Sequence, residues 1–113
     1  MSDVSLIIYP APDPAAAKRF FGELLGSEPY ADSPQYIGYK HGDIEIGLVP
    51  SAPAEQGALP YWNVDDIAAK VDALVAAGGT IAQPVTDVGY GLLVASVKAP
   101  SGALVGLRQF PKP

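Results

Sequence analysis

The sequence contains no cysteine, and among its 113 residues there is a single histidine. The lack of cysteine excludes disulfides, thiolate catalysis and cysteine-ligated zinc sites. The one histidine, His41, stands in the turn-like stretch "KHGD", where we interpret it as a solvated turn residue. No serine has a neighbouring pattern that would supply an activating base, so the sequence does not support nucleophilic catalysis.

Clusters of basic residues and long apolar runs are also lacking. The formal net charge of −5 opposes binding to nucleic-acid phosphates. No apolar run approaches the roughly 18 residues of a membrane span. The opening "MSDVSLIIYPAPD" has neither the cationic start nor the apolar stretch of a signal peptide. We therefore expect a cytoplasmic protein with no nucleic-acid partner and no membrane partner.

What the sequence does contain is an internal repeat. "YPAPDPAAAKRFFGELLG" and "YWNVDDIAAKVDALVAAGG" match at an offset of 52 residues, which pairs Tyr9 with Tyr61, Asp13 with Asp65, Lys18 with Lys70 and Gly26 with Gly78. One such unit is too small to cover both a helix and a sheet, so two must share a core. We predict one domain, 1–113, made of a unit at about 3–50, a linker at about 51–58 and a second unit at about 59–111.

Each unit has the element order β-α-β-β-β. "VSLIIY" has the β-branched pattern of a short strand, and Asp13 followed by Pro14 is typical of a helix N-cap and first turn. Gly26 stands where a left-handed C-cap would end that helix, and three short strand patterns follow. In the second unit the helix is capped by Asp65 or Asp66. The predicted class is α+β, with two tandem βαβββ units that form curved mixed sheets around a concave cavity and carry their helices on the convex faces.

The paired units, the stretch "YWNVDDI" and the closing turn "APSGALVGL" resemble the vicinal oxygen chelate superfamily of glyoxalases, bleomycin-resistance proteins and extradiol dioxygenases. The similarity covers essentially the whole chain and looks closest to small bacterial glyoxalase-like proteins. It implies the fold described above and a homodimer. It also implies a divalent metal held by His, Gln or Glu side chains from the first and last strand of each unit. This scaffold supports several chemistries as well as plain ligand binding, so the resemblance alone assigns no activity.

The residues at the four implied metal positions are not normal metal ligands. The position in the first strand of the second unit is Leu59, and its counterpart in the first unit is Ser5 or Ile7. The two carboxylate positions, in "IGL" and "VGL", are Gly47 and Gly106. Oxygen and nitrogen donors are therefore missing where a transition metal would need them. We expect a degenerate metal site, with no metal and no cofactor.

Strand alternation separates a polar from an apolar set of residues. Residues that share parity with the implied metal positions would face the cavity, because alternate side chains of a strand point to opposite faces. The candidate ligand-binding residues are Tyr9, Glu45, Gly47, Tyr61, Asn63, Gly106 and Arg108. The opposite parity is apolar and suits burial beneath the helices; it holds Leu6, Ile8, Ile46, Leu48, Trp62, Val64, Val105 and Leu107. The polar set also has structural explanations. The two tyrosines would pack at the seam between the units, Glu45 and Arg108 would form an ion pair, and Asn63 would bond to a neighbouring backbone.

Three functions are compatible with this pattern. The first is a metal-free protein that binds a small organic molecule, aromatic compounds included, since aromatic walls with a few polar groups suit a flat ligand. The second is a lyase or isomerase of the glyoxalase type that uses Glu45 as the catalytic general base, or an atypical metal site. The third is a structural or interaction domain without a ligand. Whether the protein is an enzyme stays open at this point.

Overall fold

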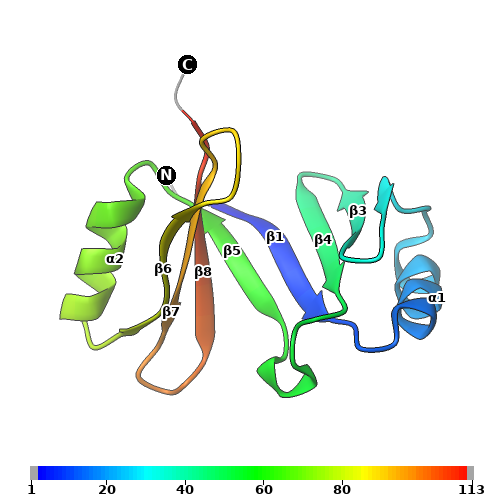
Figure 1. Cartoon of the computed structure of the whole chain (residues 1–113), viewed down its shortest axis with the longest axis horizontal. Coiled ribbons are helices and arrows are strands. Elements are labelled where there is room, and N and C mark those ends of the chain that lie inside the picture. The colour runs from blue at the N-terminus through cyan, green and yellow to red at the C-terminus, as the bar shows by residue number, and fades with distance from the viewer. Residues whose placement is uncertain (1–2, 112–113) are drawn as a thin grey trace. The chain divides into compact units, whose positions relative to one another are not determined.

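The computed structural model describes residues 3–111. The chain forms two compact units, of which one contains Ser5–Leu59 and the other consists mainly of the chain from Pro60 onward. Each unit contains one helix and a four-stranded portion of sheet (Figure 1). A short 3-10 turn, Ala54–Gln56, lies in the stretch that connects them.

The first unit has the strand order β2-β3-β4-β1. Its elements are β1 (Asp3–Pro10), α1 (Pro14–Leu25), β2 (Ala31–Asp32), β3 (Ile37–His41) and β4 (Ile44–Val49). β1 and β4 are parallel, whereas the β2–β3 and β3–β4 pairs are antiparallel. The sheet is mixed because α1 and two strands intervene between β1 and β4 along the chain.

The second unit repeats this arrangement with the strand order β5-β8-β7-β6. Its elements are β5 (Leu59–Asn63), α2 (Ile67–Ala76), β6 (Thr80–Asp87), β7 (Leu93–Lys98) and β8 (Leu104–Gln109). β5 and β8 are parallel, and the β6–β7 and β7–β8 pairs are antiparallel. The predicted α+β class and the order βαβββ in each unit are thus confirmed. Neither helix is long and apolar enough to cross a membrane, within the part of the chain that the structure describes.

The predicted N-caps begin both helices. The side chain of Asp13 accepts a hydrogen bond from the backbone N–H of Ala16 at 3.2 Å. The sequence left Asp65 and Asp66 as alternative caps of α2. The structure shows that Asp66 is the cap, because its side chain accepts a hydrogen bond from the backbone N–H of Ala69 at 3.1 Å. α1 ends at Gly26, whose φ of 66° is left-handed, as the glycine at this position predicts.

Apolar side chains beneath each helix form the two cores. Under α1 the buried cluster is Ala11, Ile37, Tyr39, Ile46 and Leu48. Under α2 it is Val64, Ile67, Val71, Ala95, Val97 and Leu107, with Val105 packed against it. The predicted burial beneath the helices is therefore correct for β4, for β8 and for Val64, which follows β5.

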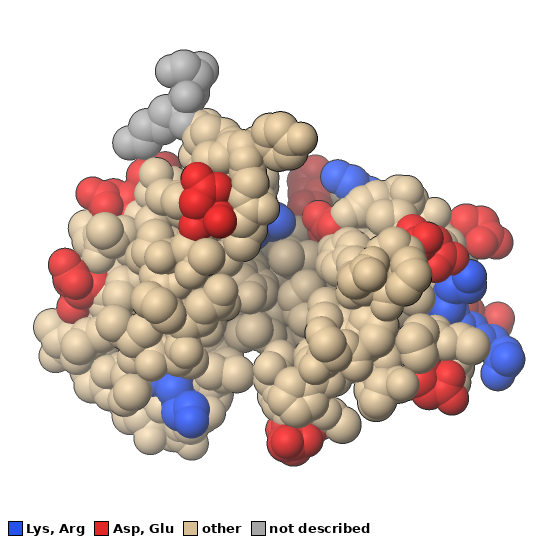
Figure 2. All heavy atoms as spheres, in the orientation of Figure 1, with Lys and Arg blue, Asp and Glu red and all other residues tan. Residues whose placement is uncertain are grey.

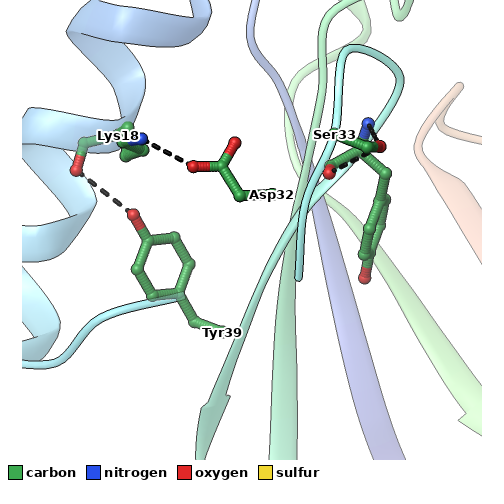
Figure 3. A network of polar contacts seen from close by, with 5 residues as sticks. Lys18, Asp32, Ser33 and Tyr39 are labelled. Atoms are coloured by element: carbon green, nitrogen blue, oxygen red, sulfur yellow. Dashed lines mark hydrogen bonds and ion pairs between the residues drawn. The ribbon is translucent and has the colours of Figure 1, made fainter. Parts of the chain in front are cut away.

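Polar contacts also hold α1 to the sheet (Figure 3). The hydroxyl of Tyr39, on β3, donates to the backbone carbonyl of Lys18 at 3.2 Å. The ammonium of Lys18 lies 2.6 Å from the carboxylate of Asp32, at the end of β2. The hydrogen bond with Asp32 and the charge of that carboxylate raise the pKa of Lys18. Burial raises the pKa of Tyr39.

The prediction of which β1 side chains point to which face of the sheet is wrong. The ring of Tyr9 packs on Phe21 of α1, with 4.8 Å between ring centroids, so Tyr9 faces the helix. Leu6 and Ile8 pair in register with Glu45 and Gly47 and share their face. The error comes from the repeat offset. Ile8 pairs with Gly47 in the first unit as Tyr61 pairs with Gly106 in the second, so β1 and β5 correspond at an offset of 61 − 8 = 53 residues. The helix caps Asp13 and Asp66 give the same offset, 66 − 13 = 53 residues, rather than 52.

Trp62 is also not the core residue that its parity predicts. Its position on β5 places it on the face of α2, but its exposed fraction is 38% and it lies outside the buried cluster.

Candidate functional site

In the first unit, two neighbouring glycines lie on the sheet face opposite α1. Gly38 of β3 is paired with Gly47 of β4. A Cβ on Gly47 would lie 2.7 Å from the Cε1 and hydroxyl of Tyr36, and 2.7 Å from Cδ1 of Ile8. A Cβ on Gly38 would lie 2.7 Å from Cε2 of Tyr36 and 2.8 Å from Cζ of Tyr30. The two tyrosine rings therefore rest directly on the backbone of the glycine pair.

Both tyrosine hydroxyls converge on Glu45. Oε2 of Glu45 accepts a hydrogen bond from Tyr36 at 2.6 Å and another from Tyr30. The ammonium of Lys40, which is paired with Glu45 across the β3–β4 ladder, lies 5.2 Å from the centroid of the Tyr30 ring. Glu45 and Tyr36 are half-buried, and Tyr30 is exposed. The result is a carboxylate held by two phenols, with aromatic surface beside it.

Neither Tyr30 nor Tyr36 was among the predicted site residues. The sequence nevertheless contains a signal for Tyr36, because in "QYIGYK" strand alternation places Tyr36, Gly38 and Lys40 on one face. A glycine inside a strand often marks a place where another group approaches the backbone closely. Tyr30 has no comparable signal in the sequence. It lies in a loop that returns to the sheet, where its backbone N–H donates to the carbonyl of Gly38 at 2.8 Å. This return is a tertiary contact that no local pattern specifies.

In the second unit, the corresponding sheet face carries Tyr61, Asn63, Gly106 and Arg108. The register pairs Tyr61 with Gly106 and Asn63 with Arg108. A Cβ on Gly106 would lie 2.5 Å from Cδ2 of Tyr61, so this ring covers its glycine as Tyr36 covers Gly47. The structure thus brings these four predicted residues to one face of one unit, and their binding of a ligand stays a prediction.

Burial shapes the electrostatics of this second face. The side chain of Arg108 is only 9% exposed, and its guanidinium lies 5.0 Å from the centroid of the Phe110 ring. Burial raises the pKa of Tyr61, while the positive charge of Arg108 acts in the opposite direction. Because the net effect is upward, Tyr61 keeps its proton at neutral pH and can donate a hydrogen bond.

The remaining predicted residues lie elsewhere. Tyr9 faces α1 and is separated by the sheet from Glu45 and Gly47, so it does not belong with them. His41 was predicted to lie in a turn. It is instead the last residue of β3, directly before that turn, and it is exposed. On the face drawn in Figure 2, the basic side chains of the described residues are interspersed with acidic ones rather than gathered into a patch.

The residues do not fit the metal site that the fold family implies. Gly47 and Gly106 offer no donor atom, and tyrosine rings occupy the space into which a longer side chain would extend. Leu59 is a buried apolar residue. Among residues 3–111, no group of three or more His, Cys, Asp or Glu side chains is placed to hold a metal ion. These side chains are poor partners for a transition metal, and the absence of a bound metal stays a prediction.

Solved structures of other proteins share this fold. A glyoxalase/bleomycin resistance protein/dioxygenase superfamily member from Vibrio splendidus 12B01 is 20% identical and aligns over 96% of this chain and 98% of its own, with a TM-score of 0.73. A methylmalonyl-CoA epimerase from Streptomyces coelicolor, in complex with 2-nitronate-propionyl-CoA, is 14% identical over 96% of this chain and 97% of its own, with a TM-score of 0.68. At such identities the likeness concerns the fold.

Sequence comparison identifies the family. CFP32 of Mycobacterium tuberculosis (strain CDC 1551 / Oshkosh), a protein whose name marks it as a candidate glyoxylase, is 34% identical over an alignment of 109 residues that covers 86% of this chain. The chain spans 41% of the length of that curated relative. The family model described as Glyoxalase/Bleomycin resistance protein/Dioxygenase superfamily matches residues 4–107. The chain therefore belongs to the glyoxalase/bleomycin resistance protein/dioxygenase superfamily.

Proposed function

We propose that this protein is a metal-independent member of its superfamily that binds a small organic molecule. One observation carries the proposal: both glycines at the implied carboxylate positions are covered by tyrosine rings. A glutamate at Gly47 would collide with Tyr36, and one at Gly106 would collide with Tyr61. In both units aromatic surface lies where the family resemblance implies a metal-ligating oxygen, which favours binding through stacking and hydrogen bonds over binding through a metal.

The first unit supports a specific kind of ligand. The half-buried ring of Tyr36 and the exposed ring of Tyr30 offer flat apolar surface, and the carboxylate of Glu45 lies between their hydroxyls. A ligand that stacks on such rings is flat, and one that approaches Glu45 gains from a hydrogen-bond donor or a positive charge. We therefore propose an aromatic compound that carries an amine, amide or hydroxyl group.

A second candidate is an isomerase or lyase that uses Glu45 as a general base. The fixed position of this carboxylate favours it, since a base must be held within hydrogen-bond reach of the proton that it removes. The epimerase with the same fold supports the view that the scaffold accommodates proton-transfer chemistry. We rank it second because Oε2 of Glu45 already accepts from two phenols, which weakens that oxygen as a proton acceptor. A domain without any ligand ranks third.

The test is a thermal-shift screen of the full chain against flat aromatic amines, amides and phenols, with aliphatic compounds of matched size as controls. A ligand at 100 times its Kd stabilises the folded state by about 2.7 kcal/mol. This corresponds to a rise of roughly 10 °C in the midpoint for a domain of this size. We expect at least one aromatic compound to give such a rise, and Tyr36→Phe to reduce it while the compound still binds.

Two outcomes would contradict the proposal. If no aromatic compound raises the midpoint, the ligand-free alternative becomes the better account. If Glu45→Gln leaves binding intact but abolishes turnover of a bound compound, as followed by proton exchange into deuterated water, the protein is an enzyme and the second candidate is correct.

A further inference from the structure

An apolar groove lies on the helix side of the second unit, away from the residues discussed so far. It has a volume of about 330 Å³ and is lined by Trp62, Val64, Lys70, Leu74, Val105 and Leu107. Strand alternation places the side chains of β5 and β8 that line it on the face opposite Tyr61 and Arg108. It is therefore distinct from the face to which the proposed function assigns a ligand.

The groove exists because α2 covers its sheet incompletely. The buried residues of α2, Ile67 and Val71, both belong to its first half. Leu74, one turn further on, is only partly buried. A smaller hollow of about 120 Å³ lies on the other side of Leu74 and Val105, and it reaches Val97 and Pro100. The second half of α2 thus leaves apolar sheet surface accessible along its length.

The lining specifies the chemistry of an occupant. Trp62 lines the groove and is 38% exposed, so part of its side chain is available for contact with an aromatic ring. The floor consists of the buried side chains of Val64 and Leu107, which exclude a polar group that lacks a partner. Of the described residues that line the groove, Lys70 alone carries a charge. An apolar body with one negative charge is complementary to this set.

A protein partner suits the groove less well than a small molecule. A stable protein–protein contact buries about 800 Å² on each partner. Six side chains around a hollow of 330 Å³ offer far less surface than this. The volume is instead at the lower end of the range of small-ligand sites, which begins at about 300 Å³.

We propose that this groove is a second binding site, which takes an aromatic monocarboxylic acid. The aromatic ring packs between Trp62 and the apolar floor, and the carboxylate pairs with the ammonium of Lys70. The site goes beyond the function proposed above, because it lies in the second unit rather than beside Glu45 of the first, and because it selects a ligand with a negative charge rather than one with a hydrogen-bond donor.

The fluorescence of Trp62 tests the proposal directly, since Trp62 is the single tryptophan of the sequence. The full chain is titrated with 3-phenylpropanoate and, as a neutral match, with 3-phenylpropanamide. We expect a saturable change in tryptophan emission with the acid. Lys70→Met should weaken binding of the acid about five-fold, the scale of an exposed ion pair, and leave binding of the amide unchanged.

Lys98→Met is the matched control, because it removes the same charge from β7 of the same unit. Lys98 shares the strand face of Ser96, which is paired with Gly106 on the side away from α2. We expect this variant to bind the acid as the unaltered chain does. Thermal midpoints of both variants establish that they are folded.

Four results would overturn the proposal. The first is a tryptophan emission that does not change up to millimolar acid. The second and third concern the variants: Lys70→Met and Lys98→Met lose acid binding equally, or Lys70→Met loses binding of the acid and the amide equally. The fourth is a tryptophan emission that changes with protein concentration alone. The last would mean that a second copy of the chain covers the groove. None of these results bears on the aromatic amines and phenols of the thermal-shift screen, so the two proposals fail separately.

Discussion

The ring of Tyr61 covers Gly106 so closely that a Cβ on this glycine would lie 2.5 Å from Cδ2 and 2.7 Å from Cγ of the ring. The first unit repeats the relationship with Tyr36 and Gly47. In both units the glycine sits on the last strand, paired with β1 or β5. Glycine is required at each place because backbone and ring are in contact.

Gly106→Ala should lower the free energy of unfolding by about 1–3 kcal/mol, the usual cost of overpacking. Cγ of Tyr61 is fixed near its own backbone, so the ring cannot simply rotate away from the new methyl group. Urea denaturation measures the effect. Gly22→Ala is the control, since a Cβ there meets nothing within 4 Å and the residue lies inside α1. That change should stabilise the protein by about 1 kcal/mol. Equal effects of the two substitutions would contradict the contact between Tyr61 and Gly106.

Tyr36 and Glu45 should be energetically coupled. Tyr36→Phe removes the hydroxyl that donates to Oε2 of Glu45 at 2.6 Å, and Glu45→Gln removes the negative charge of the accepting carboxylate, which makes this hydrogen bond strong. A double-mutant cycle measured by urea denaturation should give an interaction energy of about 1 kcal/mol, within the range for residues in one hydrogen-bonded network. Additive effects would mean that the two side chains act independently.

The N-cap of α2 should depend on Asp66. Asp66→Ala removes the acceptor for the N–H of Ala69 and should cost about 1 kcal/mol in unfolding free energy. Asp72→Ala, which removes the same charge from the exposed middle of α2, should change stability by less than about 0.5 kcal/mol. The cap is wrongly assigned if the order of the two effects is reversed.

Tyr61 should make stability fall in alkaline solution. Because burial raises its pKa in the folded state, the folded protein holds this proton more tightly than the unfolded chain does. The titration of Tyr61 therefore leaves the free energy of unfolding unchanged below the pKa of tyrosine in the unfolded chain, about 10, and lowers this free energy as the pH rises above that value. Tyr61→Phe should reduce the slope of the unfolding free energy between pH 9.5 and 11. An unchanged slope in Tyr61→Phe would contradict this assignment.

The fold could be predicted from the sequence because its signals are local. Asp13, Pro14 and Gly26 define the limits of α1, and apolar residues at strand spacing define the sheets. The face of β1 could not be predicted in the same way. Matching tyrosines and lysines favoured an offset of 52 residues, whereas the helix caps and strand pairing follow 53, and a shift of one residue exchanges the faces of a strand.

The candidate site was predicted only where strand alternation sufficed. Tyr61, Asn63, Gly106 and Arg108 share a face because β5 and β8 are adjacent and parallel. The partners of Glu45 depend on a loop that returns Tyr30 to the sheet, which no local pattern specifies. The exposure of Trp62 likewise depends on how far α2 covers the sheet, a property of packing rather than of sequence spacing.

The measurement that tests the central claim most directly is the thermal midpoint of protein treated with EDTA and then titrated with magnesium, manganese, iron(II), nickel and zinc. An ion that binds only the folded state raises the midpoint by several degrees once its concentration far exceeds its Kd. Because tyrosine-covered glycines stand where metal ligands are implied, we predict a midpoint that stays within about one degree for every ion. A shift of several degrees with any of these ions, abolished by renewed EDTA, would contradict the account.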